Sequence, residues 1–167
     1  MSKIGIYYGS TTGNTKDVAV KIAEKLGITL ADLHDVASGA VDFENYDVLL
    51  FGASTWGYGD LQDDWEDYKN KLKSVNLAGK KAALFGCGDS SAYSDSFCDA
   101  LGKIYNIIKE KGCTIIGMVD TDGYSFDSSE AVIDNKFAGL PLDVNNEDNL
   151  TESRLDAWVE QLKREMQ

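Results

Sequence analysis

Short apolar runs alternate with amphipathic stretches along most of the chain. The runs cover residues 3–8, 28–33, 48–53, 82–87 and 113–119, and each has the length of a strand. Strands that alternate with helical patterns predict an α/β fold built on a parallel sheet. The third and fourth runs, VLLFGA and AALFGC, are apolar at nearly every position. This favours strands that helices cover on both faces.

The amphipathic stretches place apolar side chains at helical spacing. The first is expected to be a helix over residues 14–26 that ends at Gly27, because glycine suits the left-handed conformation of a C-cap. The last is expected to begin after Thr151 as its N-cap, with Glu152 in its first turn. Three apolar stripes carry the later helices: Trp65, Tyr68 and Leu72; Phe97, Leu101, Ile104, Ile107 and Ile108; and Leu155, Trp158, Val159 and Leu162.

About thirty residues, 120–149, separate the fifth run from the last helix. A connection of this length is uncommon inside a compact domain. It is either an insertion that interrupts or extends the fifth strand, or a functional lid.

Length and composition exclude several classes of protein. The chain has 167 residues, so residues 1–167 are expected to form one domain. A formal charge of −12 disfavours nucleic acid and anionic membranes as partners and favours basic proteins. No apolar run could cross a bilayer, and the N-terminus has no signal-peptide pattern, so we expect a cytoplasmic location. Three cysteines without a CxxC spacing indicate neither a disulfide framework nor a metal site.

The loop between the first strand and the first helix has the chemistry of a phosphate site. Gly9 and Gly13 permit close backbone approach, and the first N–H groups of the helix would point at the bound anion. Hydroxyl and amide side chains supply further donors. The loop lacks both GxxxxGK[ST] and GxGxxG, so a terminal monophosphate held without a metal is the preferred ligand. The alternative is a turn that only caps the helix. The donors are Ser10, Thr11, Thr12, Asn14 and Thr15.

Two more loops should reach the same edge of the sheet, because the carboxyl ends of parallel strands lie together. Each loop brings one aromatic ring, Trp56 or Tyr93, and Asp89 adds a carboxylate beside Gly88. Aromatic rings stack on flat heterocycles. Taken singly, Trp56 is better explained as core and Asp89 as a turn residue. Together with the phosphate loop, they predict a site for a planar mononucleotide.

The motifs that carry these residues resemble those of flavodoxins, specifically the long-chain kind. They are GSTTGNT at 9–15, STWGYGDLQDDW at 54–65, GCGDSSAYSDSFCDA at 86–100 and the tail from GYSFDSSEAV to LTESRLDAW. The resemblance implies a three-layer sandwich with a five-stranded parallel sheet in the order 2-1-3-4-5, helices on both faces and an insertion at the fifth strand. It also implies bound FMN and one-electron transfer through the semiquinone/hydroquinone couple.

The same resemblance implies roles for individual residues. Trp56 and Tyr93 would sandwich the isoalloxazine ring, and Asp89 would accept a hydrogen bond from ring N3. The phosphate would be held by Ser10, Thr11, Thr12, Gly13, Asn14 and Thr15. The remaining cofactor-binding positions are Ser54 and Thr55, and the backbone groups of Gly57, Gly59, Cys87 and Gly88.

Gly57 departs from the family pattern, because several long-chain relatives have Asn at the position after the stacking Trp. In the family, the peptide at this position is thought to turn over when the flavin is reduced. Glycine has no Cβ to oppose either conformation. We therefore expect Gly57 to favour the neutral semiquinone.

Acidic residues gather in the loops at the predicted carboxyl edge, and lysines lie where helices return to strands. An anion about 10 Å from the flavin, at an effective dielectric of about 40, disfavours an added electron by ~0.8 kcal/mol. This corresponds to about 35 mV. We expect a low-potential monomeric carrier whose partners are basic redox proteins, namely reductases of the flavodoxin/ferredoxin type as donors and low-potential enzymes as acceptors. His34 is expected to be an ordinary surface residue.

Two other functions remain open from the sequence. An FMN-dependent NAD(P)H:quinone reductase would need space for a hydride donor over the ring, which two aromatic plates oppose. A non-redox module would bind a phosphorylated metabolite or act as a receiver. No residue set for acid–base, nucleophilic or metal catalysis is evident, so an electron-transfer protein rather than an enzyme is preferred.

Overall fold

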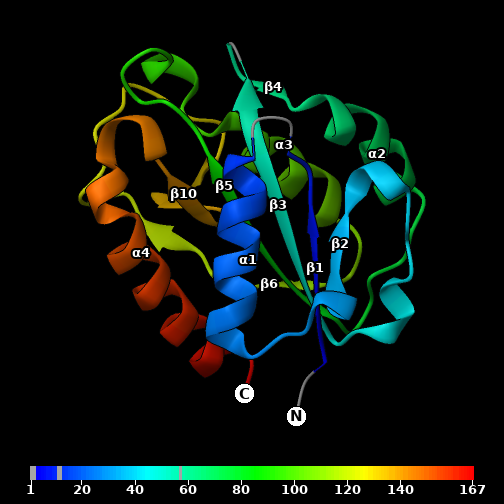
Figure 1. The fold of residues 1–167 in the computed structure, drawn as a ribbon. Coiled ribbons are helices and arrows are strands. Elements are labelled where there is room, and N and C mark those ends of the chain that lie inside the picture. The colour runs from blue at the N-terminus through cyan, green and yellow to red at the C-terminus, as the bar shows by residue number, and fades with distance from the viewer. Residues whose placement is uncertain (1–2, 11–12, 57) are drawn as a thin grey trace.

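The main sheet is parallel and has the strand order β10-β5-β3-β1-β2. The computed structural model describes residues 3–10, 13–56 and 58–167 (Figure 1). The first strands of this sheet are β1 (Ile4–Tyr8), β2 (Leu33–Asp35), β3 (Val48–Trp56) and β5 (Lys81–Cys87). The order agrees with the expected 2-1-3-4-5, because β10 takes the fifth place. The strand order reverses at β1, since β2 and β3 lie on opposite sides of it.

The fifth strand is split into two pieces that both pair with β5. Its first piece, β6 (Thr114–Ile115), pairs with Lys81 and Ala82, and its second piece, β10 (Leu140–Leu142), pairs with Phe85, Gly86 and Cys87. The expected run 113–119 therefore contributes only two residues to the main sheet. The chain leaves the sheet at Gly117, which has φ +75°. Of the three alternatives for residues 120–149, an insertion that interrupts the strand is the one observed.

The insertion forms a small antiparallel sheet of its own, in the order β7-β9-β8. Its strands are β7 (Val119–Asp120), β8 (Val132–Ile133) and β9 (Lys136–Phe137). Residues 127–130 then run along the loop that follows β5. The Phe97 N–H donates to Ser128 O at 3.3 Å, and the Glu130 N–H donates to Asp99 Oδ1 at 2.7 Å. The insertion thus supports a loop at the carboxyl edge of the main sheet.

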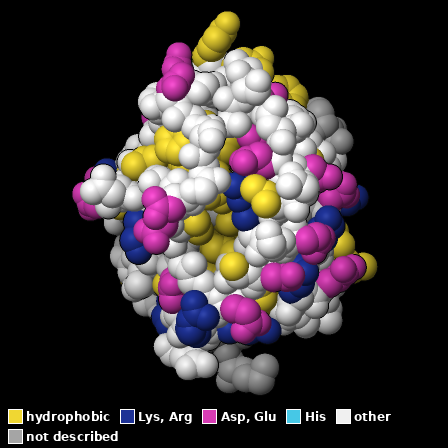
Figure 2. Space-filling view, turned by 90° about the vertical axis from the view of Figure 1, so that its left-hand side faces the viewer, with side chains coloured by type: hydrophobic (Ala, Val, Ile, Leu, Met, Phe, Trp, Pro, Cys, Tyr) yellow, Lys and Arg dark blue, Asp and Glu magenta, His cyan; other side chains and the backbone are white. Residues whose placement is uncertain are grey.

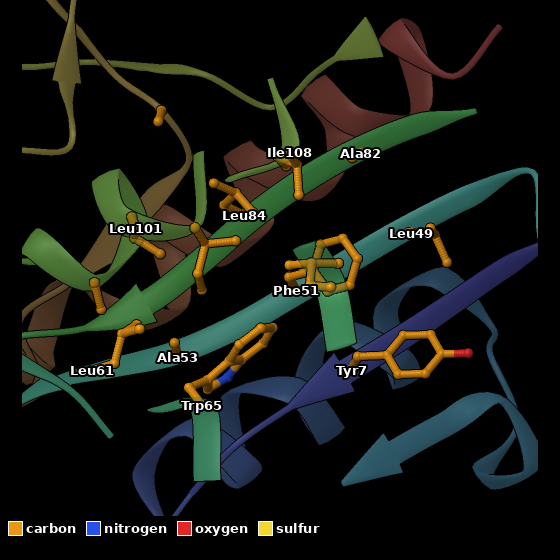
Figure 3. Packing of buried hydrophobic residues seen from close by; sticks show 14 of the residues in the cluster. Tyr7, Leu49, Phe51, Ala53, Leu61, Trp65, Ala82, Leu84, Leu101 and Ile108 are labelled. Atoms are coloured by element: carbon orange, nitrogen blue, oxygen red, sulfur yellow. The ribbon is translucent and has the colours of Figure 1, made fainter. Parts of the chain in front are cut away.

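Helices cover both faces of the sheet. α1 (Asn14–Leu26) and α4 (Val144–Glu165) pack on one face through Ile22, Leu155 and Trp158. α2 (Asp63–Lys73) and α3 (Asp99–Ile108) pack on the other (Figure 1). Figure 3 shows this second core, in which Phe51, Leu84, Leu101 and Trp65 meet between the strands and the helices. A short strand, β4 (Asp60–Leu61), pairs antiparallel with the end of β3.

Four 3-10 segments complete the described elements. They are η1 (Leu30–Asp32), η2 (Val36–Ser38), η3 (Phe43–Asn45) and η4 (Ser94–Ser96). The expected second strand over 28–33 is therefore displaced, because η1 occupies its middle and β2 begins only at Leu33.

Helix α1 has the predicted bounds and the predicted C-cap, since the Gly27 N–H donates to Ala23 O and Glu24 O at φ +71°. The expected start of the last helix at Thr151 is wrong. α4 begins at Val144 with Asp143 as its N-cap, and Thr151 is buried inside it. The helix bends at Glu147, whose φ of −132° and ψ of 38° are not helical. Thr151 resembles an N-cap in the local sequence. The helix begins earlier because contacts with other loops hold the first turn, 144–146, and local capping signals do not report such contacts.

The expectation that His34 is an ordinary surface residue is also wrong. His34 lies in β2, is half-buried, and stacks on Tyr7 with ring centroids 4.6 Å apart. Its Nε2 lies 2.7 Å from the Tyr46 hydroxyl, in a hydrogen bond whose direction depends on the tautomer. His34 is therefore part of the packing under η3.

Candidate functional site

The carboxyl ends of β1, β3 and β5 meet around a cavity of about 240 Å³ at the point where the strand order reverses. Register brings the strands to the same level, with Ser54 of β3 beside Cys87 of β5. Ligands of open parallel sheets bind at such an edge. The residues that line the cavity are Asn14, Ser54, Thr55, Trp56, Cys87, Gly88, Asp89, Tyr93, Val144 and Asn145.

The loop before α1 has the geometry of an anion site. Ser10 Oγ accepts a 3.0 Å hydrogen bond from the Gly13 N–H, which closes the loop. Gly13 has φ +97°, and no side chain of the described residues 3–10, 13–56 and 58–167 caps the N-terminus of this 13-residue helix. The first N–H groups of such a helix, together with its dipole, bind phosphate oxygens. Two predicted members of this loop, Thr11 and Thr12, lie outside the described residues.

Thr15 and Ser54 connect this loop to β3. Thr15 is fully buried, and its hydroxyl lies 2.5 Å from that of Ser54. Thr15 also makes a hydrogen bond to the Cys87 thiol, which connects it to the carboxyl end of β5. Burial raises the pKa of the Cys87 thiol to about 12, so the thiol is neutral at physiological pH. The floor of the cavity is therefore made of neutral dipoles.

Two aromatic rings border the cavity, as the sequence predicted. Trp56 ends β3 and is partly exposed, and Tyr93 is the N-cap of η4 and is 36% exposed. A third ring, that of Tyr58, is 91% exposed and meets Tyr93 edge to face at 5.7 Å between centroids. Exposed rings at a cavity rim suit a flat ligand with one accessible edge.

Asp89 lines the cavity, but its carboxylate already accepts hydrogen bonds from other groups of the chain. Oδ1 accepts from Ser91 N at 3.1 Å, Ala92 N at 2.9 Å and Asn146 Nδ2 at 2.8 Å, and Oδ2 accepts from Asn145 Nδ2 at 3.2 Å. The Ala92 N–H, followed by the Asn146 amide, holds the pKa of the Asp89 carboxyl below its usual range. Asp89 is therefore an Asx-turn residue and a cavity residue at once.

Sequence reasoning missed two lining residues, Val144 and Asn145. Both follow β10, so they lie at the carboxyl edge for the same reason as the residues after β3 and β5. The preceding run LPL does not indicate a strand from the sequence, because it is three residues long and contains a proline. Gly59, which was predicted to bind the ligand, does not line the cavity and packs on Asp99 instead. A Cβ on Gly59 would lie 2.5 Å from Asp99 Oδ2. Gly57 lies outside the described residues.

Ser96 is a further residue that the sequence did not single out. Its Oγ is buried and has no hydrogen-bond partner within residues 3–10, 13–56 and 58–167. Ser96 lies in η4, three residues after Tyr93, and its N–H donates to Tyr93 O at 3.2 Å. A buried hydroxyl without a partner costs free energy unless a ligand satisfies it.

Comparisons with known proteins agree on one family. The family model described as Flavodoxin matches residues 6–158. Flavodoxin 1 of Escherichia coli K12 is 45% identical, over 99% of this chain and 96% of its own length. Flavodoxin of Haemophilus influenzae is 42% identical, over 99% and 97%. The crystal structure of Fusobacterium nucleatum flavodoxin bound to flavin mononucleotide has a TM-score of 0.92, 30% identity and coverage of 99% of both chains.

The chain belongs to the flavodoxin family. This confirms the resemblance and the fold class. It also confirms the expected class of protein, an electron carrier that uses FMN rather than an enzyme. The quinone reductase alternative has no support from these matches. Within the part of this flavodoxin that the structure describes, every helix is too short or too polar to cross a membrane.

A second cavity of this flavodoxin, of about 320 Å³, opens between α4 and the insertion. Figure 2 looks onto this side and shows apolar side chains in a hollow. Arg154 on its wall lies over the Tyr124 ring, 4.0 Å from the centroid, and donates to Glu147 Oε1 at 3.1 Å and Gly123 O at 2.9 Å. The polar groups of this second cavity serve to hold the insertion on α4.

Charge is distributed unevenly over this flavodoxin. Lys80 and Lys81 lie at the start of β5, at the edge of the sheet opposite the cavity. Acids after β3 and β5 make no ion pair among the described residues: Asp60, Asp63, Asp64, Asp67, Asp89 and Asp95. The positions of Lys80 and Lys81 agree with the predicted placement of lysines at the edge opposite the cavity.

Proposed function

We propose that this flavodoxin binds one FMN in the cavity at the carboxyl edge and transfers single electrons between proteins. The proposal rests on one observation above all. Three strand ends bring a capless helix N-terminus, a floor of neutral dipoles and two partly exposed rings to one cavity. A phosphate with a flat ring system matches all three parts at once.

The described residues fit FMN at both ends of the molecule. Among the described residues, no atom outside the chain neighbours of Gly13 lies within 4 Å of the place that a Cβ on Gly13 would take, so these residues leave room for a phosphate beside the first turn of α1. At the other end, Trp56 and Tyr93 line the cavity and offer ring faces on which a flat heterocycle can stack. FMN, when bound, supplies the one-electron chemistry. The protein supplies binding, orientation and electrostatics.

We assign the predicted site residues as follows. Trp56 and Tyr93 stack on the ring, and Ser54 and Thr55 line the cavity between ring and phosphate. We assign Gly57, Cys87 and Gly88 to the pyrimidine side, and we leave out Gly59, because it does not line the cavity. The N3 assignment for the Asp89 carboxylate competes with its four hydrogen bonds within the chain, so we assign Asp89 to support of the loop. The phosphate is held by Ser10, Thr11, Thr12, Gly13, Asn14 and Thr15.

In this proposal, the acids in the loops after β3 and β5 set the potential and the partners. Anions close to the ring disfavour the second electron, which makes the carrier strongly reducing. The same field steers basic-surfaced proteins toward the exposed ring edge, both flavodoxin/ferredoxin reductases as donors and low-potential enzymes as acceptors. The chain works as a single domain of residues 1–167, as a monomer and in the cytoplasm.

A stepwise reductive titration of the FMN-loaded protein tests the function. Two separate one-electron steps are expected, seen as long-wavelength absorbance that first rises and then falls. Reduction in a single two-electron step would contradict the proposal. Riboflavin, which lacks the phosphate, is the matched ligand control. It should bind at least tenfold more weakly than FMN, because the α1 site would have no anion to hold.

A further inference from the structure

The loop that carries Tyr93 is closed by Asp89. The Tyr93 N–H donates to Asp89 O at 3.0 Å, and the Asp89 carboxylate accepts the N–H groups of Ser91 and Ala92. The side chain of the first residue therefore fixes the backbone that leads to the ring. Any group that fixes the Asp89 carboxylate also fixes the approach of Tyr93.

The groups that fix this carboxylate from outside the loop come from the start of α4. Asn146 Nδ2 lies 2.8 Å from Asp89 Oδ1, across 57 positions of the chain, and Asn145 Nδ2 lies 3.2 Å from Oδ2. The contact is charge-assisted, because the amide donates to an ionised carboxylate. It ties the loop after β5 to the residues after β10.

A second carboxylate shares the same amide. Asn146 Nδ2 also donates to Asp143 Oδ1 at 2.9 Å, so its two hydrogens serve two acids. Asp143 in turn accepts from the Ser90 hydroxyl and, at 3.4 Å, from the Ser90 N–H. Asn146 thus lies between two carboxylates that both hold the loop. A neutral donor is required there, since an acid would add a third negative charge.

The first turn of α4 is built as a separate unit. Glu147 departs from helical geometry, and its N–H donates to Asp143 O at 2.7 Å, which closes the turn before the bend. Glu147 Oε1 accepts from Arg154 on the other side of the bend at 3.1 Å. The turn 143–146 can therefore face the loop and the cavity while the rest of α4 packs on the sheet. Val144 and Asn145 of this turn line the cavity.

We propose that Asn146 is a positioning residue for ring stacking: by bridging Asp89 and Asp143 it holds the loop 89–93 so that Tyr93 faces the bound ring. This rests on the proposed function, in which FMN occupies the cavity. Asn146 itself touches no ligand in this proposal. Its effect reaches the ring only through Asp89 and Ser90.

The test compares Asn146→Asp and Asn146→Ala with Asn149→Asp. Asn149 is exposed and lies on the same helix, and its side chain makes no hydrogen bond among the described residues, so its substitution matches the change in charge. Binding of FMN and of riboflavin is measured by quenching of flavin fluorescence. Asn146→Asp should weaken both ligands by about tenfold or more, and Asn146→Ala by about threefold to tenfold. Asn149→Asp should change neither by more than about twofold.

An equal loss of affinity for FMN and riboflavin indicates that the position of the ring has changed. Damage to the phosphate site would weaken the binding of FMN alone. Visible circular dichroism of the bound flavin should also change in Asn146→Ala, because the angle of Tyr93 to the ring shifts. The pKa of the Asp89 carboxyl, followed by NMR, should rise in this variant. Loss of FMN binding with unchanged riboflavin binding would overturn the proposal, and so would unchanged binding of both. If the unaltered protein binds no FMN, the proposed function itself fails.

Discussion

The hydroxyl groups of Thr15 and Ser54 lie 2.5 Å apart and join the first turn of α1 to the carboxyl end of β3. Thr15 is fully buried, whereas Ser54 faces the cavity. Because the Thr15 hydroxyl bonds to the Cys87 thiol as well, it links the first turn of α1 to the carboxyl ends of two strands, β3 and β5. This contact sets the distance between the anion site and the stacking residues.

Thr15→Val should weaken FMN binding by about fivefold, the equivalent of one lost hydrogen bond of about 1 kcal/mol. Valine keeps the shape of threonine, so the core around it should not change. Riboflavin binding should fall by less than twofold, since the contact lies on the phosphate side. Both affinities are measured by fluorescence quenching. Equal losses for the two ligands would place Thr15 on the ring side and contradict this assignment.

The buried hydroxyl of Thr151 predicts a stabilising substitution. Its Oγ1 has no hydrogen-bond partner among the described residues, and Thr151 is only 4% exposed. A buried polar group without a partner costs about 1–3 kcal/mol. Thr151→Val should therefore raise the free energy of unfolding by about 1 kcal/mol, measured by urea denaturation, and leave FMN affinity unchanged. A loss of stability would show that this hydroxyl is satisfied in solution.

Strict periodicity explains which elements could be predicted from the sequence. The stripe from Val18 to Ala23 and the glycine after it are local signals, and α1 has the bounds they indicate. The start of α4 is different, because Asp143 and Asn146 are held by a loop more than fifty positions away. Local preference at Thr151 could not reveal that contact.

The split of the fifth strand explains what was missed at the site. Pro141 lies in β10, where proline is unfavourable unless the strand is at an edge. β10 is such an edge, because among the described strands it pairs with β5 alone. A three-residue strand that contains proline has no sequence signal of its own. Val144 and Asn145, which follow it, could therefore not be assigned to the cavity, whereas the loops after β3 and β5 were found from their glycines and aromatic rings.

Gly102 shows how closely the insertion packs on α3. A Cβ at this position would lie 2.3 Å from Glu130 O, a backbone atom of the segment that supports the loop 94–99. Glycine inside a helix normally costs about 1 kcal/mol relative to alanine. At Gly102 alanine should instead be less stable than glycine, because its Cβ would push the insertion away from the helix.

Gly102→Ala is therefore expected to lower the free energy of unfolding by about 1–3 kcal/mol. It should also increase proteolysis within residues 121–130, since the backbone there loses its support. Urea denaturation and limited proteolysis measure the two effects. Asn106→Ala, at an exposed position of α3, is the control and should change stability by less than about 0.5 kcal/mol. A gain in stability for Gly102→Ala would show that the insertion does not pack on α3 in solution.

The Tyr7 hydroxyl donates to Asp42 Oδ1 at 2.5 Å, and this contact predicts a pH-dependent stability. The hydrogen bond from Tyr7 is the largest cause that lowers the pKa of the Asp42 carboxyl below 3.8. A group with a lowered pKa stabilises the fold above its unfolded pKa, and this stabilisation is lost as the pH falls through the folded pKa. Burial raises the pKa of Tyr7 above 10, so its contribution is complete below pH 10 and is lost above it.

Tyr7→Phe should therefore cost about 1 kcal/mol between about pH 5 and pH 9, as one partly exposed hydrogen bond to a charged group does. The difference from the unaltered protein should shrink on both sides of this window. Below it Asp42 is protonated in both proteins, and above it the unfolded tyrosine ionises only in the unaltered chain. Urea denaturation of the FMN-free protein at several pH values measures the difference. Tyr105→Phe, which removes a hydroxyl with no hydrogen bond among the described residues, should cost less than about 0.5 kcal/mol at every pH. A Tyr7→Phe difference that stays constant from pH 3 to pH 10 would mean that the Asp42 contact does not contribute to stability.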